Sequence, residues 1–234
     1  MRTDLQISNI NSHKEEIKEL FKAAISVDCA IFAYDDQTLK ILCIHSELEE
    51  YAGLYSLVGD LVHPNETLEG AANRILEHRT GLTGVPLRQV KAFGDPQRHP
   101  AGRVITIAFF ALIDMDINAI DHMRDRRPEW VPVRSINTMA FDHAQILKDS
   151  IKAFRERFFR DALYADLLPE KFTLSDLQKL SEEVLQKKFD KRNFRKKMLS
   201  SSHIEDTQEM QKNVNHRPAK LFRISQQKIK QSNL

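Results

Sequence analysis

Apolar residues in the first half of the chain fall into runs with the length and composition of β-strands. Residues 27–34 and 39–45 are rich in β-branched and other apolar side chains, and the polar residues 35–37 between them predict a hairpin. Residues 87–94 and Val104–Ile113 also predict strands. Because Val104–Ile113 is continuously apolar, we expect it to lie in the centre of its sheet.

Helical spacing of apolar residues appears at the N-terminus and again in the middle of the chain. Ser12 followed by Glu15 has the pattern of a capping box and predicts an amphipathic helix that extends to about Ala24. A second helix is predicted over residues 68–80, and Gly81 is expected to end it in a left-handed conformation.

A short strand and a longer helix are predicted next. Residues 129–133 predict the strand, where Trp130 is either a core residue or a platform on which a ligand stacks, and the core role is favoured. Asp142 is expected to cap a helix that extends to Phe159. Its apolar stripe consists of Ile146, Leu147, Ile151, Phe154 and Phe158.

The remaining chain has a different character. Thr173 with Asp176 forms a second capping box, which opens a helix with Leu177, Leu180, Val184 and Leu185 facing inward. Asp190 can cap the following helix, in which Phe194 and Met198 lie one turn apart and face the core. Basic residues occupy another face of that helix, as in a recognition helix.

A polar loop and a strand-like run over residues 219–224 complete the pattern of a winged helix-turn-helix. The wing would carry His216, Arg217, Lys220 and Arg223. We place the domain boundary near Arg160, which gives a first domain over residues 1–160 and a DNA-binding domain over residues 161–234.

Charge is distributed unevenly along the 234 residues, although the formal net charge is only +2. Residues 187–234 carry 13 Lys and Arg residues and 4 Asp and Glu residues, a net charge of +9, which indicates a polyanionic partner. Cys29 and Cys43 lie in apolar runs and are expected to be buried free thiols. No run is long and apolar enough to span a membrane, so we expect a cytoplasmic protein.

The stretch over residues 59–82 resembles a Nudix box whose chemistry has been replaced. Alignment on Gly81 puts Glu66 and Arg74 in register, and these two are expected to form an ion pair that braces the loop. The three metal-binding glutamates of the motif are replaced by Ile75, His78 and Arg79. Since these residues supply no carboxylate, we expect neither a metal nor a cofactor, and no hydrolysis by the usual route. The alternative is that the match is accidental.

Residues 95–103 form a loop in which two arginines, Arg98 and Arg103, are held by two prolines and a glycine. Guanidinium groups suit phosphate, carboxylate or vicinal hydroxyl groups of a ligand. A rigid surface turn with solvated arginines is the other interpretation. The predicted effector-binding residues are His78, Arg79, Arg98, Arg103, Trp130 and His143.

Three motifs together resemble the Nudix-related transcriptional regulators: D-P-x-R-x-P-x-G-R over residues 95–103, F-D-H-x-x-I-L over 141–147, and the stretch 172–197. The resemblance implies a Nudix fold of the α/β (α+β) type, with a mixed sheet between helices, followed by a small winged helix. It also implies a homodimer on palindromic double-stranded operator DNA. Base and phosphate contacts are expected from Lys191, Arg192, Asn193, Arg195, Lys196, Lys197, Arg217 and Lys220.

The effector is the least determined element of this interpretation. A sugar or nucleotide sugar is expected, with the pentose L-arabinose first and sugar-catabolism genes as targets, guided by the sugar-sensing branch of these regulators. ADP-ribose or a related NAD metabolite is the alternative. An active Nudix pyrophosphohydrolase with metal ligands recruited from Glu66, Glu69 or Glu77, and an adaptor without DNA binding, are the remaining alternatives.

Overall fold

A computed structural model gives the fold of the chain, and it describes residues 22–115, 120, 127–212, 214–215 and 217–225. Most of the helix predicted from Ser12, and His216 of the predicted wing, lie outside the described residues. The prediction that this helix extends to Ala24 is wrong at its end, because Ala24 is the first residue of strand β1. It pairs with Val104 in the sheet.

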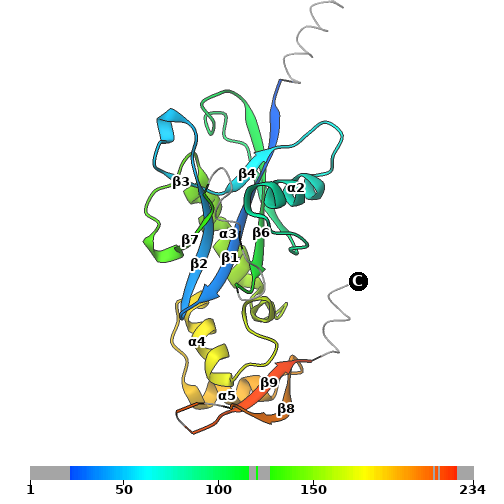
Figure 1. Ribbon diagram of the computed structural model, residues 1–234, viewed down its shortest axis with the longest axis vertical. Coiled ribbons are helices and arrows are strands. Elements are labelled where there is room, and N and C mark those ends of the chain that lie inside the picture. The colour runs from blue at the N-terminus through cyan, green and yellow to red at the C-terminus, as the bar shows by residue number, and fades with distance from the viewer. Residues whose placement is uncertain (1–21, 116–119, 121–126, 213, 216, 226–234) are drawn as a thin grey trace, which may run out of the picture.

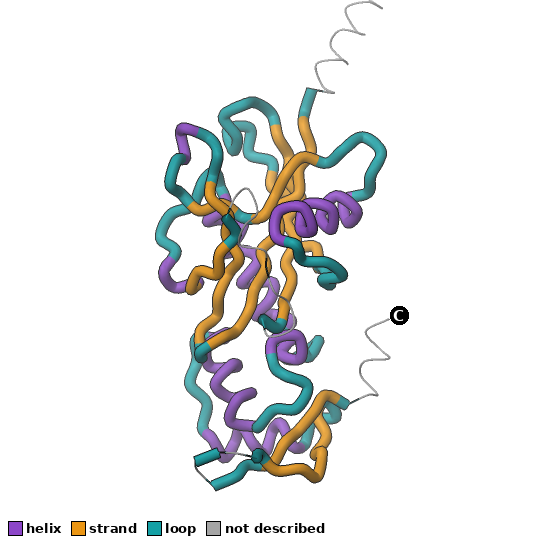
Figure 2. Tube along the Cα trace, viewed as in Figure 1, coloured by secondary structure: helices purple, strands orange, loops and turns teal. Residues whose placement is uncertain are grey.

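A mixed sheet forms the larger part of the molecule (Figures 1 and 2). The strand order is β3-β2-β1-β6-β5, with β4 paired to β1 and β7 paired to β2. β1 and β6 are parallel from Ala24 with Val104 to Ala33 with Ile113, and the other pairs are antiparallel. The strands are β1 (Ala24–Asp35), β2 (Thr38–His45), β3 (Tyr55–Ser56), β4 (Val58–Leu61), β5 (Arg88–Phe93), β6 (Val104–Ile113) and β7 (Glu129–Pro132). This confirms the mixed sheet and the central place of β6.

The predicted hairpin between β1 and β2 turns on two residues. Asp36 and Gln37 both have positive φ, 46° and 57°, while Asp35 pairs with Thr38. Two consecutive residues with positive φ match the right-handed twist of the flanking strands, which is why short hairpins use such turns. The hairpin carries β1 and β2 to the end of the sheet where the second domain lies.

Two helices cover opposite faces of the sheet, α2 (Leu68–Thr80) and α3 (His143–Arg157) (Figure 1). Alternate residues of β1 divide between the two layers. Cys29 and Ile31 pack in the apolar cluster with α2, whereas Ala30 and Phe32 pack in the cluster with α3. This alternation is the two-residue period of a strand buried on both faces.

The bounds predicted for the box helix agree with the structure. Thr67 caps α2 by accepting a hydrogen bond from the Gly70 amide at 3.0 Å, and Gly81 ends the helix with φ of 80°. Both cysteines are buried free thiols, as predicted. Burial raises the pKa of Cys43 to about 12, so its thiol is neutral at physiological pH.

The second domain is a winged helix, as predicted. Thr173 and Asp176 form the predicted capping box, and the Asp190 side chain accepts from the Asn193 amide at 2.9 Å. Phe194 and Met198 are both buried. The elements are the short helix η3 (Leu163–Leu167), α4 (Leu174–Leu185), α5 (Lys191–Leu199), β8 (Ile204–Met210) and β9 (Lys220–Ile224).

Strand β8 was not predicted; that segment was expected to be a polar loop. It pairs antiparallel with β9, from Ile204 with Ile224 to Met210 with Lys220. Its sequence, IEDTQEM, has an apolar residue only at each end, so hydrophobic alternation is absent from this described strand. The segment forms a strand because it pairs with β9, which lies later in the chain, and local sequence alone does not predict this.

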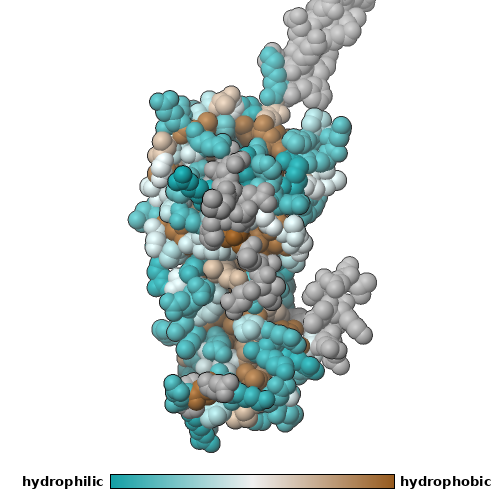
Figure 3. All heavy atoms as spheres, in the orientation of Figure 1, coloured by the Kyte–Doolittle hydropathy of each residue, from teal (hydrophilic) through white to brown (hydrophobic). Residues whose placement is uncertain are grey.

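One continuous apolar cluster joins the two domains. It extends from Phe32 of β1 through Phe154 and Phe158 of the α3 segment to Leu177 of α4 and Phe194 of α5. The winged helix therefore lies against the end of the β1–β2 hairpin and of α3 (Figure 1). The surface in view is largely hydrophilic, with small apolar patches (Figure 3). No helix in the described part of the chain is long and apolar enough to cross a membrane.

Candidate functional site

A cavity of about 620 Å³ opens beside the 95–103 loop. Its walls come from the first half of β1, the segment after β2, the strand β4, the loop itself and the start of α3. Its charged lining residues balance in formal charge: the cations are Lys22, Arg98 and Arg103, and the carboxylates are Asp28, Glu47 and Asp60.

The innermost arginine, Arg98, is only 7% exposed and binds two carboxylates. Its Nε and NH2 groups donate to the two oxygens of Asp142 at 2.9 and 2.7 Å, and NH2 also approaches Asp28 Oδ2 at 3.4 Å. Burial works to lower the pKa of Arg98, but the hydrogen bonds and the two negative charges outweigh it and raise the pKa. Arg98 thus lines the cavity and also ties the loop to β1 and α3.

Asp142 caps α3 in a different way from the prediction. Both of its side-chain oxygens accept from Arg98, and the Asp142 carbonyl accepts from the Gln145 and Ile146 amides at 2.9 and 3.1 Å. The expected side-chain cap is therefore wrong, because the ion pair with a distant arginine has taken both carboxylate oxygens.

His143 lies beside this ion pair and is buried. Its Nδ1 accepts from the Leu57 amide at 3.0 Å, and its Nε2 faces Asp28 Oδ1 at 3.4 Å. Since Nδ1 accepts from a backbone amide, the ring proton is on Nε2, directed to Asp28. Burial lowers the pKa of His143, and the nearby Asp28 opposes this. The imidazole is neutral and bridges α3 to β1.

Gly59 makes room for this cluster. A Cβ at position 59 would lie 2.1 Å from Asp28 Oδ1 and 2.7 Å from the Val27 carbonyl oxygen. Gly59 lies in β4, and its φ is outside the positive range, so no turn conformation requires glycine here. Glycine is needed here for the close approach of a carboxylate and a neighbouring strand.

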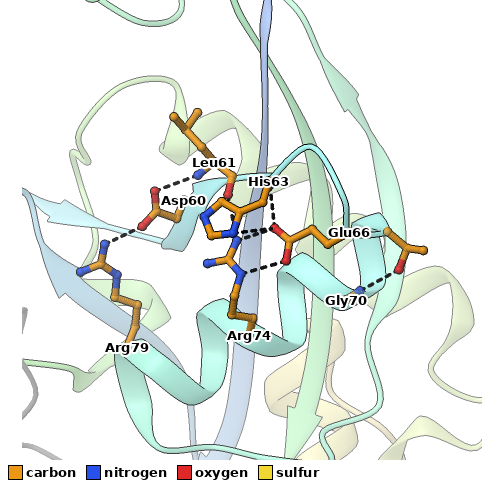
Figure 4. A network of polar contacts seen from close by, with 8 residues as sticks. Asp60, Leu61, His63, Glu66, Gly70, Arg74 and Arg79 are labelled. Atoms are coloured by element: carbon orange, nitrogen blue, oxygen red, sulfur yellow. Dashed lines mark hydrogen bonds and ion pairs between the residues drawn. The ribbon is translucent and has the colours of Figure 1, made fainter.

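The ion pair predicted inside the box region is present (Figure 4). Arg74 donates to the two oxygens of Glu66 at 2.9 and 2.5 Å and to the Leu61 carbonyl at 3.0 Å. Glu66 also accepts from the His63 amide at 2.7 Å. The bond from Arg74, followed by that from His63, lowers the pKa of Glu66 to about 2. The pair braces the loop between β4 and α2, as predicted.

The three positions of the metal-binding glutamates hold no carboxylate that could bind a cation. Ile75 is 1% exposed and packs in the apolar cluster, His78 is exposed, and Arg79 binds Asp60 with NH2 to Oδ2 of 2.6 Å (Figure 4). Within the described part of the chain, no group of three or more His, Cys, Asp or Glu side chains is placed to hold a metal ion. These residues do not fit the divalent cation of a Nudix hydrolase.

The predicted effector residues divide into two groups in the structure. Arg98, Arg103 and His143 line the cavity. Arg79 lies behind the lining residue Asp60. His78 is outside the lining, and so is Trp130, which pairs with Leu42 and packs partly against the cluster that contains α2.

Several lining residues escaped prediction, among them Asp28, His99 and Phe141. Phe141 has φ of 55°, and the His99 ring stacks on it at 4.9 Å with an interplanar angle of 11°. A phenylalanine with positive φ is unusual and often marks a functional site. The one signal in the sequence was Asp28, a lone carboxylate inside an otherwise apolar strand.

The winged helix presents a second candidate surface. Five polar residues of α5 are exposed: Lys191, Arg192, Asn193, Arg195 and Lys196. Lys197 is exposed too, but its ammonium lies over the Phe159 ring at 5.2 Å from the centroid. Lys220 pairs with Asp206 at 2.8 Å, and Arg217 is exposed in the wing. A helix with buried apolar anchors and an exposed basic face can enter the major groove of DNA.

A Nudix-type domain with a cavity, joined to a winged helix with a basic surface, defines a class of DNA-binding regulators. The sequence model of the NUDIX domain matches residues 22–154. The model of the NrtR DNA-binding winged helix domain matches residues 164–224.

A relative matches across both domains. This is the "ADPR responsive transcriptional repressor NtrR" of Acinetobacter baylyi, which is 31% identical over 207 residues, 87% of this chain and 82% of the relative. The chain belongs to the family of NrtR-like regulators, in which a Nudix domain is followed by a winged helix DNA-binding domain.

Two further comparisons extend the picture. The crystal structure of Shewanella oneidensis NrtR complexed with a 27mer DNA has a TM-score of 0.74 at 24% identity and covers 88% of this chain and 95% of that chain. At this identity the likeness concerns the fold. The ADP-ribose pyrophosphatase of Methanocaldococcus jannaschii is 30% identical over 130 residues, 55% of this chain and 73% of the relative.

We expect Gly59→Ala to destabilise the protein by at least about 2 kcal/mol, since the added methyl group must displace Asp28 or the Val27 backbone. Chemical denaturation measures the change. Gly94→Ala is the matched control, because its Cβ would meet only ordinary contacts at 3.8 Å. Equal stability of the two variants would contradict the close-approach role of Gly59.

We expect Glu66→Gln to lower the melting temperature at neutral pH, with a difference that closes in acid. The Glu66 pKa is about 2 in the folded state against an ordinary 4.5. Its stabilisation is therefore complete above 4.5 and is lost as the pH falls towards about 2. Melting curves from neutral pH to about pH 3 test this, with the exposed Glu77→Gln as control. A difference independent of pH would exclude the ion pair as its cause.

Proposed function

We propose that this protein is an ADP-ribose-responsive transcriptional repressor, in which the Nudix-like domain binds the effector and the winged helix binds operator DNA. One observation carries the proposal: the repressor of Acinetobacter baylyi is similar over 87% of the chain, so the likeness includes both the domain with the cavity and the DNA-binding domain. That repressor is described as responsive to ADPR.

The cavity has the size and chemistry for such a ligand. Its volume of about 620 Å³ lies within the usual range for small-molecule sites. Arg103 is exposed at its edge, where one N–H donates to the Gly94 carbonyl at 2.6 Å. A guanidinium carries five N–H donors and favours phosphate oxygens. Arg103 is therefore our candidate for a direct contact to the diphosphate, whereas Arg98 holds the cavity floor.

The expected pentose effector and the expected sugar-catabolism targets find no support among the relatives. ADP-ribose, the alternative, fits them better, because both curated relatives carry this compound in their names. Replacement of the metal-binding glutamates is compatible with a diphosphate ligand, since arginines can hold phosphates without hydrolysing them.

An active ADP-ribose pyrophosphohydrolase is the competing function, favoured by the likeness to the Methanocaldococcus jannaschii enzyme. The local structure argues against it. Glu66 is engaged with Arg74, and both Glu69 and Glu77 are exposed on α2. Magnesium-dependent release of AMP from ADP-ribose by the purified protein would contradict the proposal that the Nudix-like domain binds its effector without hydrolysing it.

For DNA we propose that Arg192, Asn193, Arg195 and Lys196 reach base edges in the major groove, while Lys191, Lys197, Arg217 and Lys220 neutralise phosphates. This helix would supply one half-site, and a homodimer would occupy a palindromic operator. Lys197 and Lys220 must exchange their contacts with Phe159 and Asp206 for phosphate contacts in this arrangement. The domain boundary near Arg160 is part of the same proposal.

We expect the double variant Arg192→Ala with Arg195→Ala to lose about 30- to 25,000-fold in affinity for its DNA site, since each base-reading arginine contributes about 1–3 kcal/mol. Fluorescence anisotropy with a duplex selected by the wild-type protein from a randomised pool measures this. The control is Lys148→Ala with Lys152→Ala, which removes the same charge from exposed positions on α3. Equal loss in both variants would mean that only net charge matters.

We expect ADP-ribose, and not L-arabinose, to bind the protein and to change its affinity for the same duplex by about fivefold or more. Thermal shift provides the first readout: a ligand at 100 times its dissociation constant adds about 2.7 kcal/mol to the stability of the folded state. Anisotropy with and without ADP-ribose provides the second. A thermal shift with L-arabinose alone would contradict the proposed effector.

A further inference from the structure

A carboxylate in the wall of the cavity is neutralised from behind by a guanidinium of α2. Asp60, on β4, lines the cavity, and its Oδ2 is 2.6 Å from NH2 of Arg79. Figure 4 shows Arg79 extending from the last turn of α2 towards Asp60. The Arg79 side chain is 13% exposed and that of Asp60 is 40% exposed, so the carboxylate is accessible from the cavity while its counter-charge is largely covered.

The geometry of this pair is fixed by its surroundings. Asp60 Oδ1 accepts from the Leu61 amide at 2.8 Å, so each carboxylate oxygen has a partner. Arg79 lies one turn beyond the buried Ile75, in the last turn of α2, where the helix dipole favours a cation. Position 79 is also one of the three at which the Nudix motif has a metal-binding glutamate.

Relative to that motif, position 79 has lost a carboxylate, and with it a ligand for the bound cation. The guanidinium of Arg79 places a positive charge at the same position. We propose that the Arg79–Asp60 pair replaces the divalent cation of the Nudix fold, so that the diphosphate of the effector binds in this cavity without metal. This inference rests on the proposed function, because it concerns the same effector and the same cavity.

The charge balance of the cavity gives the physical reason. Asp28 shares Arg98 with Asp142, and Asp60 pairs with Arg79, which lies outside the lining. Removal of Arg79 would take away the ion pair of the Asp60 carboxylate, so more of its negative charge would face the cavity and repel a diphosphate. The same carboxylate, once released, would also be a hard oxygen ligand for Mg²⁺.

The test is titration calorimetry of ADP-ribose into the full chain, in buffer with EDTA and in buffer with Mg²⁺. The wild-type protein is expected to bind equally well in both. Arg79→Met is expected to bind about 10- to 100-fold more weakly in EDTA and to recover part of this loss in Mg²⁺. Lys152→Met, which removes an exposed cation from α3, is the matched control and should behave as the wild type.

Two more variants separate charge from packing. Asp60→Asn added to Arg79→Met removes the carboxylate that has lost its ion pair with Arg79, so affinity in EDTA should return and the response to Mg²⁺ should disappear. Arg79→Lys keeps the cation and should retain most of the affinity in EDTA. It also provides a folded variant if Arg79→Met fails to fold, and a loss in Arg79→Lys as large as that expected for Arg79→Met would contradict the charge argument.

The outcomes distinguish this inference from the proposed function. If the wild-type protein binds ADP-ribose in neither buffer, the proposed function is contradicted. Binding by the wild type only in Mg²⁺ would leave ADP-ribose as the effector and overturn the inference. Unchanged affinity of Arg79→Met in EDTA would overturn it as well.

Discussion

The buried ion pair between Arg98 and its two carboxylates is the interaction on which the functional half of the molecule depends. Burial of a guanidinium costs free energy unless the group is paired. The two partners of Arg98 are far apart in the sequence: Asp28 lies in the first strand, and Asp142 lies at the start of the last helix of the Nudix-like domain. The same carboxylate of Asp28 faces His143 and requires Gly59 beside it. One charge cluster thereby fixes the arginine loop, the cavity floor and the beginning of α3.

The box region keeps the ion pair that braces the Nudix loop. Glu66 and Arg74 still brace the loop between β4 and α2, so the wall of the cavity keeps its shape. At the former metal positions an apolar residue, an exposed imidazole and a paired guanidinium stand instead. The loop is thus braced, and the helix is capped, by residues other than Ile75, His78 and Arg79.

The sequence predicted the elements whose signals are local, and it failed where the partner is distant. The bounds of α2 and β6 agreed because a threonine cap, a terminal glycine and a continuous apolar run are all readable in one segment. Strand β8 has only its pairing with β9 to order it. The interaction of Asp142 with Arg98 joins residues 44 positions apart, so a good local cap was predicted in its place. Of the cavity, the arginine loop and His143 were predicted, whereas Asp28 and Phe141 depend on the folded arrangement.

Helix α3 is the element that physically connects the cavity to the DNA-binding domain. Its 15 residues make it about 22 Å long, with His143 on the cavity floor at one end. At the other end Arg155 donates to the Val184 carbonyl of α4 at 2.6 Å, and the Phe159 ring packs near Phe194 of α5. A ligand shifts an equilibrium only when it binds two states unequally. One apolar cluster contains residues of both domains, including Phe154 of α3 and Phe194 of α5. A tilt of α3 would therefore change the packing around α5, so a movement in the first domain would reach the second.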